Sequence, residues 1–179
     1  MRIVVVEPHP DDAFLSLGWH IEKLWKDDSV IIVTVYADEK REREAGVYAD
    51  AVGAESVCLG LEESRMSSIG RICPIELLRA ILAGLEWDHI VFPLGLQHPD
   101  HQRVAVSRFP GSLRYLDSPY LAKLKMAEAL SRKAEGMYLY SICFPPKRKW
   151  RHVPIFKSQS KFFHFNPMAD FKIPEIILK

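Results

Sequence analysis

The sequence has few cysteines, no long apolar run and no excess of charge of either sign. Its 179 residues include three cysteines, Cys58, Cys73 and Cys143, and carry a formal net charge of +1. The cysteines are odd in number, far apart and without Cys-x-x-Cys spacing, which argues against a disulfide framework and indicates a reducing compartment. No segment approaches the roughly 20 apolar residues that span a bilayer. We therefore expect a cytoplasmic protein with no membrane span.

The sequence also lacks two features that are typical of proteins that bind nucleic acids or nucleotides. The chain has no long run of charges of one sign of the kind that binds nucleic acid. No Gly-x-Gly-x-x-Gly follows the first apolar run, at residues 3–6, and no P-loop is present, which disfavours nucleotide binding. That first apolar run is also too short for the apolar core of a signal peptide. We expect neither a nucleotide cofactor nor a nucleic-acid partner.

Apolar runs typical of buried parallel strands alternate with amphipathic helical patterns. We expect strands at residues 3–6, 30–36, 56–59 and 89–93, and helices at residues 12–26, 39–52 and 74–85. This order predicts an α/β fold, a Rossmann-like, mostly parallel sheet with helices on both faces. The length and the 48% of hydrophobic residues favour a single domain, with a core at residues 1–110 and a C-terminal part at residues 111–179 that packs on it.

The C-terminal part carries weaker patterns. Residues 137–144 have the pattern of a further strand, and residues 121–130 have helical periodicity. The tail is aromatic, with Phe156 and four later phenylalanines among prolines. Such a segment is too apolar for a disordered linker, so we expect it to pack on the body of the protein or on a second subunit of a homo-oligomer.

Histidine and aspartate side chains follow two of the expected strands. They are His9, Asp11 and Asp12 after the first strand, and His98, Asp100 and His101 after the fourth. In doubly wound sheets, ligands bind outside the carboxyl ends of the strands. The two clusters therefore predict one metal site built from two loops.

The residue types favour a catalytic divalent ion, and zinc above all. Catalytic zinc is held by three protein ligands and keeps a fourth position for water, whose pKa the metal lowers. His9, Asp12 and His101 would supply two imidazoles and one carboxylate to one ion per chain. Iron or cobalt would accept the same ligands.

The other members of the two clusters also have a use in hydrolysis. Asp11 and His98 are placed for proton transfer, because a hydrolase needs a base for the proton of water and an acid for the leaving group. Asp100 would orient a neighbouring histidine. Each loop alone has a simpler explanation, since His-Pro-Asp is a common turn in which Pro fixes φ and Asp caps a helix. Two such loops at strand ends favour the metal site.

The two motifs resemble those of a known family. Residues 8–12 (PHPDD) and 98–101 (HPDH) are similar to the signature of the PIG-L/LmbE-like zinc N-deacetylases. The resemblance implies an α/β zinc hydrolase. It would remove an N-acyl group, chiefly N-acetyl, from an amino-sugar conjugate such as an N-acetylglucosaminyl compound.

The resemblance also assigns roles to individual residues. It makes His9, Asp12 and His101 the zinc ligands and Asp11 the general base. His98 becomes the histidine that acts as an acid or stabilises the tetrahedral intermediate. These roles agree with those argued from the residue types.

Two further positions resemble substrate contacts of the family. Arg41 matches an arginine that binds sugar hydroxyls, and Glu63 is the nearest match to an acidic residue that contacts substrate. A simpler explanation for Arg41 is a solvated helix face, because residues 39–44 are almost all charged. The chain departs from the family at Ala13, where many relatives have Glu, and at Leu96, where some have Tyr. Oxyanion stabilisation would then depend on the metal and His98.

Two other functions compete with deacetylation. A two-metal phosphoesterase would need more carboxylates than the clusters supply. A sugar-binding or regulatory protein on a degenerate deacetylase scaffold is favoured by Ala13, by Leu96 and by the short C-terminal part. Acetate release from metal-loaded protein separates the deacetylase from the binding protein.

Overall fold

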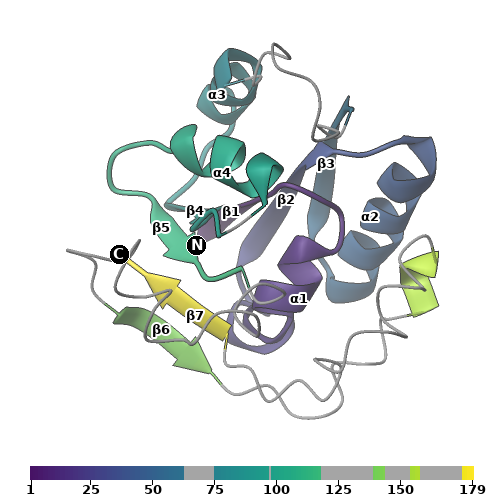
Figure 1. Ribbon diagram of the computed structural model, residues 1–179. Coiled ribbons are helices and arrows are strands. Elements are labelled where there is room, and N and C mark those ends of the chain that lie inside the picture. The colour runs from purple at the N-terminus through teal and green to yellow at the C-terminus, as the bar shows by residue number, and fades with distance from the viewer. Residues whose placement is uncertain (63–74, 97, 118–138, 144–153, 158–174) are drawn as a thin grey trace.

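The computed structural model describes residues 1–62, 75–96, 98–117, 139–143, 154–157 and 175–179. In this part of the chain, seven strands form one sheet in the order β3-β2-β1-β4-β5-β7-β6 (Figure 1). The strands are β1 (Arg2–Glu7), β2 (Ser29–Tyr36), β3 (Glu55–Leu61), β4 (His89–Pro93), β5 (Leu113–Tyr115), β6 (Leu139–Cys143) and β7 (Glu175–Leu178). Neighbours from β3 to β5 pair in parallel, whereas β7 is antiparallel to both β5 and β6.

Helices follow the parallel strands. They are α1 (Asp12–Trp19), the π-helix η1 (His20–Leu24), α2 (Glu39–Val52), α3 (Ile75–Ala83) and α4 (Pro99–Val106). The predicted α/β fold with a mostly parallel sheet is confirmed. The division of the chain near residue 110 stays a prediction. Every helix among the described residues is too short or too polar to cross a membrane.

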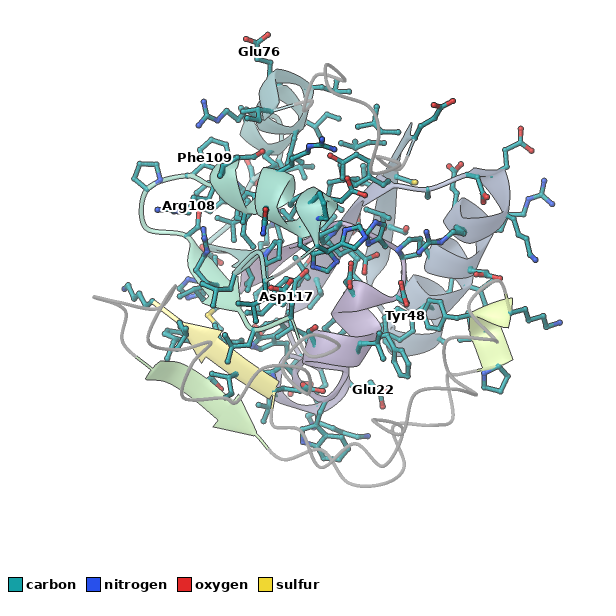
Figure 2. The ribbon with its side chains drawn as sticks, in the orientation of Figure 1. Glu22, Tyr48, Glu76, Arg108, Phe109 and Asp117 are labelled. Atoms are coloured by element: carbon teal, nitrogen blue, oxygen red, sulfur yellow. The ribbon has the colours of Figure 1, made fainter. Side chains whose placement is uncertain are left out.

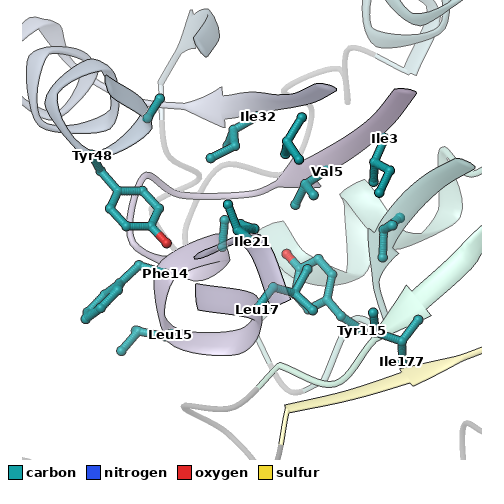
Figure 3. Packing of buried hydrophobic residues seen from close by; sticks show 14 of the residues in the cluster. Ile3, Val5, Phe14, Leu15, Leu17, Ile21, Ile32, Tyr48, Tyr115 and Ile177 are labelled. Carbon is teal, nitrogen blue, oxygen red and sulfur yellow. The ribbon is translucent and has the colours of Figure 1, made fainter. Parts of the chain in front are cut away.

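The sheet is covered on both faces, which explains why β1 reads as an unbroken apolar run. On one face, Ile3 and Val5 pack with Phe14 and Leu17 of α1 and with Tyr48 of α2 (Figure 3). All five side chains are at most 1% exposed. Burying a large apolar side chain contributes roughly 1.5–3 kcal/mol, so this layer fixes α1 against the sheet.

The C-terminal part contributes to the same layer. The ring of Phe156 stacks on Phe14, with 5.3 Å between the ring centroids, and lies 5.5 Å from the ring of Tyr48. The expectation that the aromatic tail packs on the body holds for Phe156. The four later phenylalanines, and the helical pattern at residues 121–130, lie outside the described residues.

A second apolar layer covers the opposite face of the sheet. Val4 and Val6 of β1 pack there with Leu78 and Leu82 of α3 and Val104 of α4. Successive residues of β1 point to opposite faces, so this strand joins both layers. Helices on both faces hold β1 at the centre of the molecule.

The strand order places β1 beside both β2 and β4. The chain runs from β1 outward through β2 to β3, and then returns to the other side of β1 as β4. The carboxyl ends of β1 and β4 are therefore the topological switch point, where open α/β sheets bind their ligands. Both His/Asp clusters begin there.

The first helix differs from its predicted course. An uninterrupted helix was expected at residues 12–26, but the α-helix ends at Trp19 and continues as π-helix to Leu24. At this junction, the carboxylate of Glu175 accepts hydrogen bonds from the backbone N–H groups of Trp19 (2.9 Å) and His20 (3.0 Å). We attribute the change from α-helix to π-helix to the Glu175 carboxylate. It accepts backbone N–H groups that a regular α-helix would pair with its own carbonyl oxygens.

The same carboxylate binds the side chain of His20. Glu175 Oε2 lies 2.9 Å from His20 Nδ1, and His20 Nε2 lies 2.9 Å from the hydroxyl oxygen of Ser141. Glu175 and His20 are at most 1% exposed. These hydrogen bonds connect β6, through Ser141, and β7, through Glu175, to the end of the first helix.

Glu175→Ala is expected to lower the free energy of unfolding by about 3 kcal/mol, because it leaves buried donors without their acceptor. Urea unfolding followed by circular dichroism, with metal chelated, measures this. The control is Glu39→Gln, at a side chain that is 92% exposed in an ion pair with Arg43; we expect a loss below about 0.5 kcal/mol there. Equal losses in the two variants would contradict the assignment.

Candidate metal centre

The first loop is closed by hydrogen bonds between its own residues. After β1, the chain turns through Pro8 and Pro10, and the Asp12 carboxylate accepts the backbone N–H of His9 at 2.9 Å. The backbone N–H of Asp12 in turn donates to the carbonyl oxygen of His9 at 3.1 Å. These two bonds fix both side chains on the same side of the loop.

The second loop opens directly into α4. His98 is the N-cap, and its Nδ1 accepts the backbone N–H of Asp100 at 3.2 Å. Pro99 follows in the first turn, where its missing N–H costs nothing. His101, also in the first turn, is 1% exposed. The capping hydrogen bond therefore orients the ring of His98 and places His101 in the first turn of α4.

Gly95 lets α4 approach the end of β4 closely. Its φ is +81°, and a Cβ there would lie 2.7 Å from the Cβ of Ala105 and 3.1 Å from the carbonyl oxygen of His101. Only glycine combines this conformation with this clearance. The close approach brings the second loop against the first.

His9, Asp12 and His101 converge as the sequence predicts. Asp12 Oδ2 lies 3.3 Å from His9 Nδ1 and 3.2 Å from His101 Nε2. One ligand atom from each residue lies within 4.8 Å of the others. A tetrahedral ion with bonds of about 2.1 Å separates its ligand atoms by ~3.4 Å. The donor types and spacing therefore fit a divalent metal ion.

His9, His98 and Asp100 form a second group that meets the same distance criterion. Asp100 Oδ2 lies 3.3 Å from His9 Nε2, and Asp100 Oδ1 lies 3.3 Å from a guanidinium nitrogen of Arg103. The ring of His9 thus faces Asp12 with one nitrogen and Asp100 with the other. Asp100 is fully buried and contacts a histidine, as expected from the sequence.

The carboxylates make the candidate metal centre attractive to positive charge. Burial lowers the pKa of His101, but Asp12 and Asp117 outweigh it and raise the pKa to about 10. Burial also disfavours the ionised form of Asp12, yet His101 and His9 hold its pKa below the usual range. The site therefore retains a positive charge among its ligands, and a divalent cation would take the place of a proton.

The two proton-transfer candidates differ in their surroundings. Burial and the neighbouring Asp12 raise the pKa of Asp11, whereas Arg41 opposes this shift. A guanidinium nitrogen of Arg41 lies 3.3 Å from Asp11 Oδ1. Burial and the nearby rings of His9 and His101 lower the pKa of His98. Arg41 thus lies at the site and not on a solvated helix face, while Glu63 lies outside the described residues.

Asp117 is a buried site residue that the sequence analysis missed. Its Oδ1 lies 2.6 Å from His101 Nδ1, and its Oδ2 accepts the backbone N–H groups of Gly95 and Leu96, both at 2.9 Å. Asp117 lies toward the interior, whereas Glu76 of α3 projects from the surface (Figure 2). A carboxylate on the far nitrogen of a ligand histidine fixes its tautomer and ring orientation. The available signal was an aspartate directly after residues 113–116, of which three are apolar or aromatic and one is Arg114.

Glu7 is a second missed residue, at the end of β1. It is 1% exposed, and its carboxylate accepts hydrogen bonds from Ala13 N–H and the Thr34 hydroxyl. Burial raises the pKa of Glu7 to about 8, although these two hydrogen bonds oppose the shift. Ala13 has no carboxylate of its own, but the carboxylate of Glu7, from the preceding strand, accepts the backbone N–H of Ala13.

Solved structures similar to this chain include two deacetylases. The zinc-inhibited form of teicoplanin deacetylase Orf2 has a TM-score of 0.74 at 14% identity, over 99% of this chain and 97% of its own. N,N'-diacetylchitobiose deacetylase from Pyrococcus horikoshii has a TM-score of 0.56 at 17% identity, over 99% and 83%. These deacetylases belong to the LmbE/PIG-L family. The chain shares its fold with these two deacetylases. The fold that the motif resemblance implies is thereby confirmed.

The shared fold alone does not decide the reaction. No protein-family model matches the sequence, and no curated protein does. GalB, a 4-carboxy-2-hydroxymuconate hydratase from Pseudomonas putida, has a TM-score of 0.59 at 12% identity, over 91% of this chain and 81% of its own. Function must therefore be argued from the side chains of the site.

Asp117→Asn is expected to weaken metal binding by about 10- to 100-fold. An amide cannot accept from His101 and from two backbone N–H groups at once, so His101 loses its fixed orientation. Competition with a chromophoric chelator for Zn²⁺ or Co²⁺ measures the affinity. The control is Asp27→Asn, at a side chain that is 87% exposed; wild-type affinity in Asp117→Asn would contradict the role of Asp117.

Proposed function

We propose that the protein is a metal-dependent hydrolase that removes an N-acyl group, chiefly N-acetyl, from an amino-sugar conjugate such as an N-acetylglucosaminyl compound. The observation that carries the proposal is the convergence of His9 Nδ1, Asp12 Oδ2 and His101 Nε2, with the buried carboxylate of Asp11 close enough to interact electrostatically with Asp12 and His9. The deacetylases that share the fold support the reaction and the substrate class.

His9, Asp12 and His101 would hold the metal ion, one per chain. This set is favoured over His9, His98 and Asp100, because His98 Nδ1 already accepts a backbone hydrogen bond and Asp100 is paired with Arg103. The donor set suits zinc, and iron or cobalt would also bind. When bound, the ion supplies Lewis acidity, lowering the pKa of water and polarising the acyl carbonyl.

Asp11 is the general base of the proposed reaction. It takes a proton from the attacking water, whose oxygen forms a bond to the acyl carbon, and delivers that proton to the amine nitrogen as the C–N bond breaks. The products are a free amine and a carboxylate. Arg41, 3.3 Å away, holds the carboxylate of Asp11 in place.

His98 is the proposed donor to the oxygen that becomes negatively charged during attack. Because His98 Nδ1 accepts the N–H of Asp100, a neutral ring carries its proton on Nε2 and donates from there. Asp100 orients His9 from its other ring nitrogen. Glu63 stays a predicted substrate contact, and Arg41 is proposed to bind sugar hydroxyls with the part of its fork that does not face Asp11.

Asp11→Asn is expected to lower kcat by about 100-fold or more, because the amide cannot take the proton of water, while metal content stays near wild type. His101→Ala is expected to lose both turnover and metal. Acetate release from a panel of N-acetylglucosamine conjugates and elemental analysis of purified protein measure the two quantities.

Three outcomes would contradict this division of roles. Equal loss of metal in Asp11→Asn and His101→Ala would make Asp11 a ligand. About two metal ions per chain would favour a phosphoesterase. Sugar binding without acetate release, in metal-loaded wild type, would favour a binding or regulatory role for the scaffold.

Arg41→Lys is expected to raise KM by about 10-fold with little change in kcat, because lysine keeps the charge beside Asp11 but loses the planar fork that binds hydroxyls. Arg41→Ala is expected to raise KM and also to lower kcat. Steady-state kinetics on the best conjugate of the panel separate the two effects. Unchanged KM in both variants would remove Arg41 from the substrate site.

A further inference from the structure

The start of α1 is capped in an unusual way. The first N–H groups of a helix lack partners within the helix, and an aspartate at the N-cap ordinarily accepts one from the second or third residue that follows. Here the N-cap is Asp11, but its side chain makes no capping hydrogen bond. The N–H of Ala13, two residues on, donates to Glu7 Oε2 at 2.8 Å instead.

Glu7 is itself held from the sheet. Its Oε1 accepts the hydroxyl hydrogen of Thr34 at 2.6 Å, and the two residues are direct partners in the pairing of β1 with β2. Thr34 is fully buried and Glu7 is 1% exposed. The two hydrogen bonds therefore fix the Glu7 carboxylate between β2 and the first turn of α1.

This arrangement decides where the carboxylate of Asp11 lies. Since Glu7 accepts the hydrogen bond that an N-cap aspartate would take, Asp11 is not drawn onto its own helix. Asp11 Oδ1 lies instead 3.3 Å from a guanidinium nitrogen of Arg41, on the side of the candidate metal centre. A buried N–H without an acceptor is costly, so removal of Glu7 would leave Ala13 N–H in need of a new partner, and Asp11 is the adjacent one.

We propose that Glu7 is a positioning residue that caps α1 in place of Asp11 and thereby keeps the carboxylate of Asp11 available as the general base. The inference rests on the proposed function for its catalytic consequence. Glu7 does not touch the reacting atoms, because its two carboxylate oxygens accept hydrogen bonds from Ala13 N–H and the Thr34 hydroxyl. It acts through Asp11, while the metal ligands keep their places.

The test compares Glu7→Gln with Glu7→Leu. Glutamine has an oxygen for Ala13 N–H and an amide N–H that the Thr34 hydroxyl can accept, so we expect kcat within about 3-fold of wild type. Leucine has neither group, and Asp11 is expected to turn onto Ala13 N–H. We expect Glu7→Leu to lower kcat by at least about 10-fold while metal affinity changes by less than about 3-fold. Crystal structures of the variants locate Asp11 directly.

Two further variants separate positioning from loss of stability. Should Glu7→Leu fold poorly, Glu7→Leu with Thr34→Val replaces both partners by apolar groups and removes the unpaired hydroxyl. Leu82→Ala, in the apolar layer on the other face of the sheet, lowers stability without touching α1. We expect its kcat and metal affinity to equal those of wild type below its melting temperature.

The outcomes distinguish this inference from the proposed function. The role of Glu7 would be overturned if the structure of Glu7→Leu showed Asp11 in its wild-type position. A wild-type kcat in Glu7→Leu would also overturn it. A large loss of metal affinity in Glu7→Leu would instead make Glu7 a support of the ligands and would also overturn it. Absence of acetate release from metal-loaded wild type would contradict the proposed function, and the position of Asp11 in the variant structure would still decide whether Glu7 governs it.

Discussion

The parallel pairing of β1 with β4 is the constraint on which the site depends. Five residues separate Pro93, at the end of β4, from Pro99, at the start of α4, and four residues separate the end of β1 from the start of α1. Loops of that length cannot reach far from their strands. Hydrogen bonds between the two strands therefore bring two histidines and their aspartates to one point, although about 90 residues separate them in sequence.

Charge balance is the second constraint at this point. Buried carboxylates are costly unless they are paired or hydrogen-bonded, and the three that contact the imidazoles are all paired. Asp117 binds His101, Asp100 binds His9 and Arg103, and Asp12 lies between two rings. Asp100 and Asp117 fix the two imidazoles by the ring nitrogens that face away from Asp12. The candidate ligand side chains are therefore oriented before any cation binds.

The sequence predicted those parts of the molecule that depend on local pattern. The strands β1 to β4 are evident as apolar runs in the sequence. The helix α2 is evident from its charged face and from its end at Gly53. The two motifs are evident because their residues are contiguous. The short strands β5 and β7 were missed, since three or four residues carry no periodicity. Asp117 and Glu7 were missed for another reason: their partners come from other strands or loops, and only the fold brings those partners close.

The change from α-helix to π-helix after Trp19 also depends on contacts between residues far apart in sequence. These contacts affect the order in which the protein folds during synthesis. The helix that begins at the metal centre ends on the carboxylate of Glu175, which is 155 residues from His20 in sequence. Contacts of such separation form late, because the loop between them must first be ordered. During synthesis, the first helix emerges from the ribosome long before its partner does. We therefore infer that the end of this helix, and its hydrogen bonds to β6 and β7, form only after the chain has been translated beyond Glu175.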